Sequence, residues 1–311
     1  MPRASTKPSA PRKPATKVEQ PQYGLVCITF SNECRYRTTT RAAYLALPDD
    51  AARRALLERI YWENISRFHN ALSYCDRHDI RLYRVTSSLF PMSDEPIGDA
   101  VLRGYGALLS SIGRRAERLK IRIVIHPDQF VVLSSDTPKV VQTSVMILEK
   151  HALAFDLIGL PRSPWAAMII HGGKADRAER LLETISQLSP AVRSRLCLEN
   201  DEYSYSATDI LRICRAANVP MVFDNLHHAI KEQLDSYDHP SIRRLTRAAC
   251  ATWPRPGWQL VHLSNGNTAF RDRNHSQLIT DLPAAYSDVP WIEVEARGKE
   301  QAINDLRARR K

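Results

Sequence analysis

The sequence predicts an α/β protein in which eight parallel strands and their helices form a (β/α)8 barrel. Eight short and nearly continuous apolar runs occur along the chain, and stretches with helical periodicity separate them. Such runs are typical of parallel strands that are buried on both faces. A chain of 311 residues has the size of one such TIM barrel. The alternative, a doubly wound open sheet, would require a glycine-rich phosphate loop after the first strand, and the sequence has none there.

The expected strands are residues 24–30, 82–85, 121–125, 166–170, 196–198, 219–223, 258–261 and 291–294. The expected helices pass through Glu58, Trp62 and Phe68, run from the turn at 93–96 to about Lys120, lie around residues 140–157, 175–188, 207–217 and 240–249, and end with one through Ala302 and Leu306. Apolar residues are continuous in the strands and recur with helical spacing between them, so we expect a helix after each strand.

The chain divides into a short tail and one domain. Residues 1–22 are rich in Pro, Ser, Ala, Lys and Arg, with Glu19 as the only acid, and they show no periodicity. We therefore expect a disordered basic tail, followed by a single barrel domain over residues 23–311. The net charge of +10 favours a polyanionic partner such as DNA, although a basic surface can also serve solubility alone.

Cysteine usage and hydropathy indicate a protein of the cytoplasm. The six cysteines are scattered and form no Cys-x-x-Cys pair, so we interpret them as reduced thiols and not as a disulfide framework or zinc ribbon. No apolar run approaches the length of a membrane span. No seam for a homodimer is recognisable, and we expect a monomer.

Side chains that commonly bind metals end six of the expected strands. They are His126, His171, Glu199, Asp224, His262 and Glu295, with His227 one helical turn beyond Asp224. The carboxyl ends of barrel strands meet on one rim, so these groups should converge. One such residue alone is more often structural, but six separate structural accidents explain the pattern poorly. Without cations the clustered carboxylates would repel one another, and the sequence therefore predicts a site for two or three divalent ions.

Several short motifs resemble those of the UV damage endonucleases. They are His-Pro-Asp-Gln-Phe (126–130), His-Gly-Gly-Lys (171–174), Leu-Glu-Asn-Asp (198–201), Phe-Asp-Asn-Leu-His-His (223–228), Val-His-Leu-Ser (261–264), Asn-His-Ser (274–276) and Val-Glu-Ala-Arg-Gly-Lys-Glu (294–300). The resemblance extends over about residues 24–301 in the family's order and leaves out the tail. It implies a DNA repair enzyme with a TIM barrel, similar to endonuclease IV.

The resemblance further implies which residues hold the ions. Motif position assigns His126, His171 and Glu199 to a first ion, Glu199, Asp224, His262 and Glu295 to a second, and His227 and His275 to a third. The catalytic residues would be Glu199, which bridges the ions, together with His262 and Glu295. Manganese is the family's usual metal, and the mixed donors are also compatible with zinc or magnesium.

The implied reaction is cleavage of a phosphodiester in damaged double-stranded DNA. Divalent cations lower the pKa of a bound water and neutralise the leaving oxygen. In this family the cut falls 5′ of a photoproduct and leaves a 3′-hydroxyl, and cleavage at abasic sites is a substrate variant of the same activity. The enzyme would work in the cytoplasm, at the nucleoid in a bacterium.

Lesion recognition is implied for the loop after the third strand. Gln129 and Phe130 match the pair that inserts into the duplex at the damaged step, where an amide and a ring can fill the gap left by extruded bases. The alternative for Phe130 is packing beneath its own loop. The basic residues that could contact phosphate are Lys174, Arg35, Arg37 and Arg84.

The chain departs from the family pattern at four positions. Leu25 and Thr29 occupy the places of an aromatic residue and an amide near the end of the first strand. Glu95 stands in place of a histidine, and Leu260 in place of a lysine that can be carboxylated to serve the third metal. Leucine cannot bind a metal. The third ion is therefore expected to be absent, or held by His227, His275 and another acid, for which we expect Glu95 or Asp272.

Two other functions remain open from the sequence. A metal-dependent sugar isomerase or epimerase uses the same barrel and similar rim residues, but its small neutral substrates do not require a chain of charge +10. A noncatalytic protein that binds damaged DNA would have no use for an intact set of ligands around a bridging carboxylate.

Overall fold

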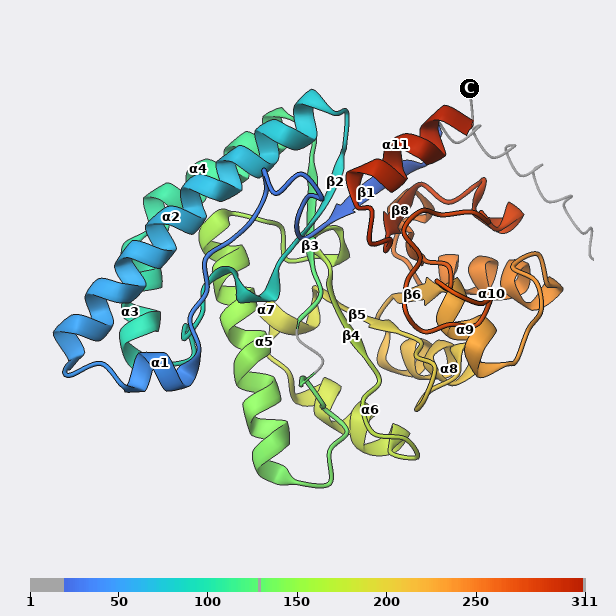
Figure 1. Ribbon diagram of the computed structural model, residues 1–311. Helices are drawn as coiled ribbons and strands as arrows, with labels where there is room; N and C mark the ends of the chain where they lie inside the picture. The colour runs from blue at the N-terminus through green and yellow to red at the C-terminus, as the bar shows by residue number, and fades with distance from the viewer. Residues whose placement is uncertain (1–19, 128–129, 310–311) are drawn as a thin grey trace, which may run out of the picture.

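The computed structural model describes residues 20–127 and 130–309 of the chain. Its eight strands are parallel, pair in sequence order and close into a barrel where β1 meets β8 (Figure 1). They are β1 (Gln22–Val26), β2 (Leu82–Val85), β3 (Arg122–Ile125), β4 (Met168–His171), β5 (Leu196–Glu199), β6 (Met221–Asp224), β7 (Leu260–Leu263) and β8 (Trp291–Val294). The predicted (β/α)8 fold is confirmed.

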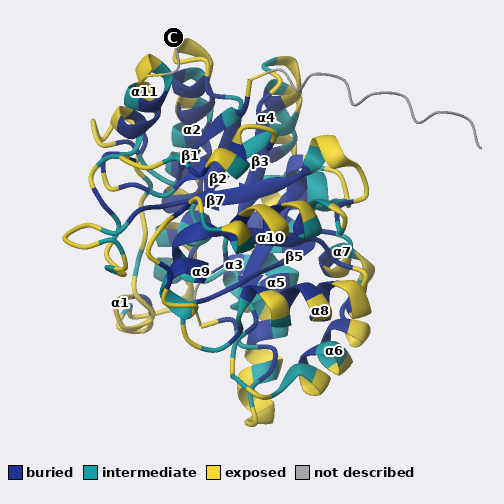
Figure 2. Cartoon of the chain, turned by 90° about the vertical axis from the view of Figure 1, so that its right-hand side faces the viewer, coloured by how far each residue is buried: buried dark blue, intermediate teal, exposed yellow. Residues whose placement is uncertain are grey.

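Helices surround the barrel, with their exposed sides outward and the strands buried within (Figure 2). The α-helices are α1 (Arg41–Leu45), α2 (Asp50–Arg77), α3 (Pro96–Gly104), α4 (Gly106–Arg118), α5 (Pro138–Ile158), α6 (Ala178–Gln187), α7 (Pro190–Arg193), α8 (Ala207–Ala217), α9 (Asn225–Lys231), α10 (Pro240–Cys250) and α11 (Glu300–Arg309). Short 3-10 turns are η1 (Ser87–Leu89), η2 (Pro164–Ala166), η3 (Pro256–Trp258) and η4 (Ala284–Tyr286). Among the described residues, no helix is both long enough and apolar enough to cross a membrane.

The observed elements differ from the expected ones in three places. The first strand stops at Val26, because Cys27 has a φ of 62° and leaves extended geometry. The helix expected from the turn at 93–96 to about Lys120 is divided into α3 and α4 at Tyr105, whose φ of −90° and ψ of 10° interrupt it. A helix after every strand is wrong for the seventh strand, since only the short turn η4 lies between β7 and β8.

Two apolar cores explain why the strand ends carry the polar residues. A large core packs the barrel against its helices, and a small one fills the barrel itself. Side chains alternate along a strand, so the next inward position lies two residues later, at the mouth. Inward residues of the small core therefore precede the predicted ligands by two positions: Val124 before His126, Ile169 before His171, Cys197 before Glu199, Val222 before Asp224, and Leu260 before His262.

Arg122 closes the opposite end of the barrel. Its guanidinium is fully buried and donates to the main-chain oxygens of Trp165 at 2.8 Å, Trp258 at 3.0 Å and Pro164 at 3.0 Å. It also lies over the ring of Trp165, 4.8 Å from the centroid. Burial lowers the pKa of Arg122 to about 10.

Replacing Arg122 by methionine should lower the free energy of unfolding by about 3 kcal/mol, because three buried carbonyl groups lose their donor. Chemical denaturation of the purified variant measures this. Arg118→Met, at an exposed position of α4, is the control and should change stability little. Equal stability of the two variants would show that the surrounding tryptophans close the barrel without the charge.

Candidate metal centre

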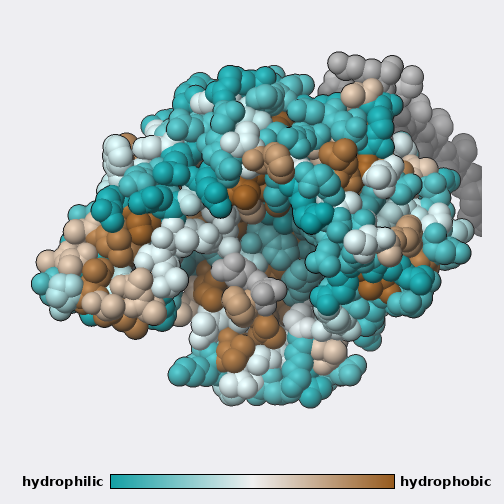
Figure 3. Space-filling view, viewed as in Figure 1, coloured by the Kyte–Doolittle hydropathy of each residue, from teal (hydrophilic) through white to brown (hydrophobic). Residues whose placement is uncertain are grey.

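Histidine and carboxylate side chains from β3 to β8 gather at the mouth of the barrel. Three groups of residues each offer ligand atoms within 4.8 Å of one another: His126, His171 and Glu199; Glu199, Asp224 and His227; and Asp224, His262 and Glu295. Glu199 and Asp224 each belong to two groups, so the three groups form one continuous cluster. In Figure 3 this side of the molecule is hollowed near its centre, with hydrophilic residues in the depth of the hollow.

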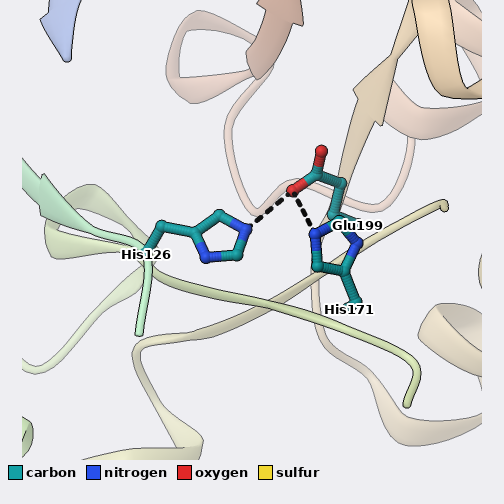
Figure 4. Close-up of side chains that lie close together, drawn as sticks. All are labelled: His126, His171 and Glu199. Atoms are coloured by element: carbon teal, nitrogen blue, oxygen red, sulfur yellow. Dashed lines mark hydrogen bonds and ion pairs between the residues drawn. The ribbon is translucent and has the colours of Figure 1, made fainter. Parts of the chain in front are cut away.

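The first group lies at the ends of β3, β4 and β5 (Figure 4). Oε2 of Glu199 lies 3.0 Å from Nε2 of His126 and 3.9 Å from Nε2 of His171. Nδ1 of His126 lies 2.9 Å from the main-chain oxygen of Pro127 and can donate to it. With an ion bound, that bond would leave the lone pair of Nε2 free to face the ion, which is how a second partner orients a metal-binding imidazole.

The second oxygen of Glu199 faces the other side of the cluster. Oε1 lies 2.9 Å from Nδ1 of His262 and 3.4 Å from Nδ1 of His227. Glu199 is almost fully buried, so both oxygens are confined to these directions. A carboxylate with one oxygen toward each group has the arrangement that a bridging ligand requires.

Asp224 is fixed by the chain around it. Its Oδ1 accepts a hydrogen bond from the main-chain N–H of His227 at 2.7 Å, which caps α9, and its Oδ2 accepts one from the hydroxyl of Ser264 at 3.2 Å. The side-chain amide of Asn200 exchanges two hydrogen bonds of 3.0 Å with the main chain of Asp224. Asn200 and Ser264 therefore hold Asp224 in place.

Glu293 is a buried acid of the cluster that the sequence prediction missed. Its Oε2 lies 2.6 Å from Nε2 of His262. The alternation Trp-Ile-Glu-Val-Glu over residues 291–295 contained the signal, because Glu293 and Glu295 must point to the same side of β8. Arg84, which we expected to contact phosphate, instead lies buried against both acids, 2.9 Å from Glu293 and 2.5 Å from Glu295. A guanidinium held in this way belongs to the cluster and not to the surface.

The guanidinium of Arg84 and a protonated His262 offset the negative charge of the carboxylates in the cluster. Burial alone would lower the pKa of His262, but the carboxylates of Glu199 and Glu295 raise it to about 10. Burial would raise the pKa of Glu295, but Arg84 and His262 hold it below its usual range. The carboxylates thus favour positive charge at the point where the ligand atoms converge. Imidazole nitrogens and carboxylate oxygens in this number are donors that fit manganese, zinc or magnesium-like ions.

Comparison with known proteins identifies the family. Residues 21–310 match the family described as UV-endonuclease UvdE. The chain belongs to this family. It is 53% identical to the UV DNA damage endonuclease of a Nostoc species, over 94% of this chain and 91% of the relative. The UV DNA damage endonuclease of Deinococcus radiodurans is 48% identical, over 92% of this chain and 95% of the relative.

A solved structure agrees with the fold. The crystal structure of SacUVDE aligns with a TM-score of 0.78 at 24% identity, covering 94% of this chain and 99% of that one. At this identity the likeness bears on the barrel alone. The family resemblance drawn from the motifs is confirmed by the matching family and by the two relatives.

Four of the residues expected to contact DNA lie in loops that follow barrel strands: Phe130, Lys174, Arg35 and Arg37. Phe130 is 73% exposed, so it does not pack beneath its own loop, and Gln129 lies outside the described residues. Lys174 pairs with Asp136 at the surface. In the loop after β1, Arg37 lies 3.3 Å from Glu63, and Arg35 donates to the side chain of Asn32 at 3.2 Å.

The two acids suggested for a third ion have other partners. Glu95 pairs with Arg41, and Asp272 accepts hydrogen bonds from Thr268 and Asn274 within its own turn. His275 reaches the edge of the cluster, with Nε2 4.0 Å from Oε2 of Glu295.

An acid that the sequence prediction missed lies beside His227 instead. Oε2 of Glu202 is 3.6 Å from Nε2 of His227, and Oε1 of Glu202 lies 2.9 Å from Arg273.

The other departures from the family pattern lie in the packing of the barrel. Leu260 belongs to the small core inside the barrel, and Leu25 to the large core outside it. Thr29 is buried, and its hydroxyl accepts a hydrogen bond from the main-chain N–H of Cys34 at 3.0 Å.

Proposed function

We propose that this chain is a metal-dependent DNA repair endonuclease that cuts damaged duplex DNA on the 5′ side of a UV photoproduct and leaves a 3′-hydroxyl. Abasic sites are a second proposed substrate. The observation that carries the proposal is the placement of Glu199, whose two oxygens face separate groups of ligands. Membership in the UV-endonuclease family supports DNA as the substrate, as does the net charge of +10.

The proposed ligands of the first ion are His126, His171 and Glu199, those of the second are Glu199, Asp224, His262 and Glu295, and His227 and His275 adjoin a third position. Manganese is the expected metal, and zinc or magnesium would suit the same donors. Divalent ions bound here would supply Lewis acidity, which activates water and stabilises the leaving oxygen.

The chain's own residues contribute position and charge. Glu199 and Asp224 are buried, and Asn200 and Ser264 hold Asp224 in place, so little reorganisation accompanies ion binding. Preorganised groups of this kind stabilise charge that develops during a reaction. Phe130 stands exposed in the loop that follows His126, where it can reach a distorted base step. We expect the protein to act as a monomer in the cytoplasm.

A nicking assay tests the function. Supercoiled plasmid that is UV-irradiated, abasic or undamaged is incubated with the protein and Mn²⁺, and end-labelled oligonucleotides report the position of the cut. We expect nicks in the irradiated plasmid, fewer in the abasic one and very few in the undamaged one. Turnover of none of the three, by protein that carries stoichiometric metal, would favour a sugar isomerase or a binding protein.

Phe130→Ala should reduce the preference for damaged over undamaged DNA by about tenfold or more, because an aromatic ring stacked on a base contributes about 1–3 kcal/mol. Nicking rates on irradiated and on undamaged plasmid give the preference. Trp62→Ala removes an aromatic side chain of similar exposure from the outer helix α2 and should leave the preference unchanged. An equal loss in both variants would contradict a role for Phe130 in recognising lesions.

A further inference from the structure

The two ring nitrogens of His262 face different partners. Nδ1 lies 2.9 Å from Oε1 of Glu199 and 3.5 Å from Oε1 of Glu295, on the side of the metal ligands. Nε2 lies 2.6 Å from Oε2 of Glu293. His262 and Glu293 are both fully buried. An ion held by these ligands would therefore meet Nδ1, while Nε2 contacts Glu293.

Arg84 holds Glu293 through two parallel hydrogen bonds. Nε donates to Oε1 of Glu293 at 2.9 Å, and Nη2 donates to Oε2 at 2.9 Å. Nη2 also lies 2.8 Å from Nε2 of His262. A guanidinium can only donate, and the two hydrogens of Nη2 have acceptors in Oε2 of Glu293 and in Oε1 of Glu295, which lies 2.5 Å away, so Nη2 does not donate to Nε2 of His262. Oε2 of Glu293 is therefore the acceptor that Nη2 and Nε2 share. The contact of 2.6 Å then places a proton on Nε2, since a bare nitrogen would set its lone pair against the carboxylate.

Packing alone does not account for a buried ion pair at this depth. The interior of a parallel barrel is normally filled by branched apolar side chains, and Leu82, Val124 and Val222 fill it here. Replacing a buried ion pair by apolar residues of similar size is often neutral or stabilising. Apolar side chains could therefore fill this space at no cost in stability, and the contacts of Glu293 with Arg84 and His262 point to a role in orienting His262.

We propose that Glu293 is a positioning residue of the metal centre, which keeps a proton on Nε2 of His262 so that this imidazole binds its ion through Nδ1. Arg84 secures Glu293 and ties it to the ligand Glu295. Partners of this kind fix the tautomer and ring orientation of metal-binding histidines. The proposal rests on the metal centre of the proposed function and does not depend on which DNA lesion is cut.

Glu293→Gln tests the positioning role, since the amide keeps the size of the side chain and loses its charge. Metal-free protein is titrated with Mn²⁺, and electron paramagnetic resonance measures the free ion. We expect the ion at His262 to bind about 10- to 100-fold more weakly. The ion at His126 and His171 should bind as in the unchanged protein. Equal affinity of both ions in the variant would overturn the proposal.

A paired variant separates positioning from stability. Arg84→Met together with Glu293→Leu fills the same space without buried charge, so its melting temperature should be at least that of the unchanged protein. Its affinity for the ion at His262 should still fall. Arg122→Met is the matched control, because it removes another buried arginine of the barrel at the end away from the ligands. It should lower stability and leave Mn²⁺ affinity unchanged.

Nuclear magnetic resonance can detect the tautomer of His262 directly. In ¹⁵N-labelled protein loaded with Zn²⁺, Nε2 of His262 should carry a proton and Nδ1 should show the shift of a metal-bound nitrogen. The Nε2–H signal should move in Glu293→Gln. Zinc bound through Nε2, or a paired variant that holds both ions as tightly as the unchanged protein, would overturn the proposal. None of these measurements uses DNA, so a failure of the proposed cleavage is recognised separately in the nicking assay.

Discussion

Glu199→Gln is expected to reduce nicking of UV-irradiated plasmid by about 10³-fold or more, the largest effect of any single substitution in the cluster. Glutamine has one oxygen and one NH₂ group, so it can offer a ligand atom to only one side. Glu199 presents oxygens to both, with Oε2 toward His126 and Oε1 toward His262. The NH₂ group of the variant would point toward one of the two ligand groups, and because it is a hydrogen-bond donor it cannot bind a cation there. Metal content should fall together with activity.

Plasma emission spectrometry of dialysed protein measures the metal content, and the nicking rate is taken under saturating Mn²⁺. Glu117→Gln, at an exposed position of α4, makes the same chemical change far from the mouth and should alter neither quantity. Circular dichroism should show that both variants fold. A Glu199→Gln protein that keeps its metal and nicks at the normal rate would remove the bridging role from Glu199.

The fold could be predicted because buried parallel strands leave a strong pattern. Seven of the expected strands end within two residues of the observed ends, since apolar runs stop where the chain reaches the mouth. The exception is β1, where the apolar run continues past Cys27 although the backbone turns at its positive φ. Local conformations of this kind have no signature in hydrophobic spacing. The same holds for Tyr105, which divides one periodic stretch into α3 and α4.

The site could be predicted only as far as strand ends reveal it. His126, His171 and Glu199 end their apolar runs and lie together as expected. Glu293 lies inside an apolar run, and Arg84 lies inside another, so each resembles an isolated polar residue until the two strands are placed in one barrel. Glu202 lies in a loop, where its approach to His227 depends on the course of the chain and not on periodicity. Contacts between residues on distant strands cannot be predicted from a single sequence.

The apparent affinity for Mn²⁺ should rise steeply with pH, because the metal-free cluster carries protons that an ion must displace. Burial by itself lowers the pKa of His262, but Glu199 and Glu295 raise it to about 10. Burial likewise lowers the pKa of His227, and Asp224 and Glu199 raise it well above its ordinary value. Both imidazoles are therefore charged near neutral pH. Each displaced proton makes the affinity rise about tenfold per pH unit below the relevant pKa.

The stability of the metal-free protein should instead pass through a maximum in mildly acidic solution, because one contribution is lost at high pH and another at low pH. The raised pKa of His262 gives a contribution that is complete below its ordinary value of 6.5 and is lost as the pH rises through about 10. Burial raises the pKa of Glu293, but Arg84 and His262 lower it to about 2. Its contribution is complete above its ordinary value of 4.5 and is lost as the pH falls through about 2. Between these limits, from 4.5 to 6.5, both contributions are present.

Calorimetric titration with Mn²⁺ at pH 6 and pH 8 measures how the affinity for the ion depends on pH. We expect an increase in affinity of roughly 10²- to 10⁴-fold, for one or two protons displaced. The heat of binding should also differ between two buffers of unlike ionisation enthalpy. His78→Gln, at an exposed position outside the cluster, should leave these values unchanged. Equal affinities at both pH values would mean that the imidazoles are already neutral without metal. Buried carboxylates would then lie together without compensating protons, and the charge balance inferred for the cluster would be wrong.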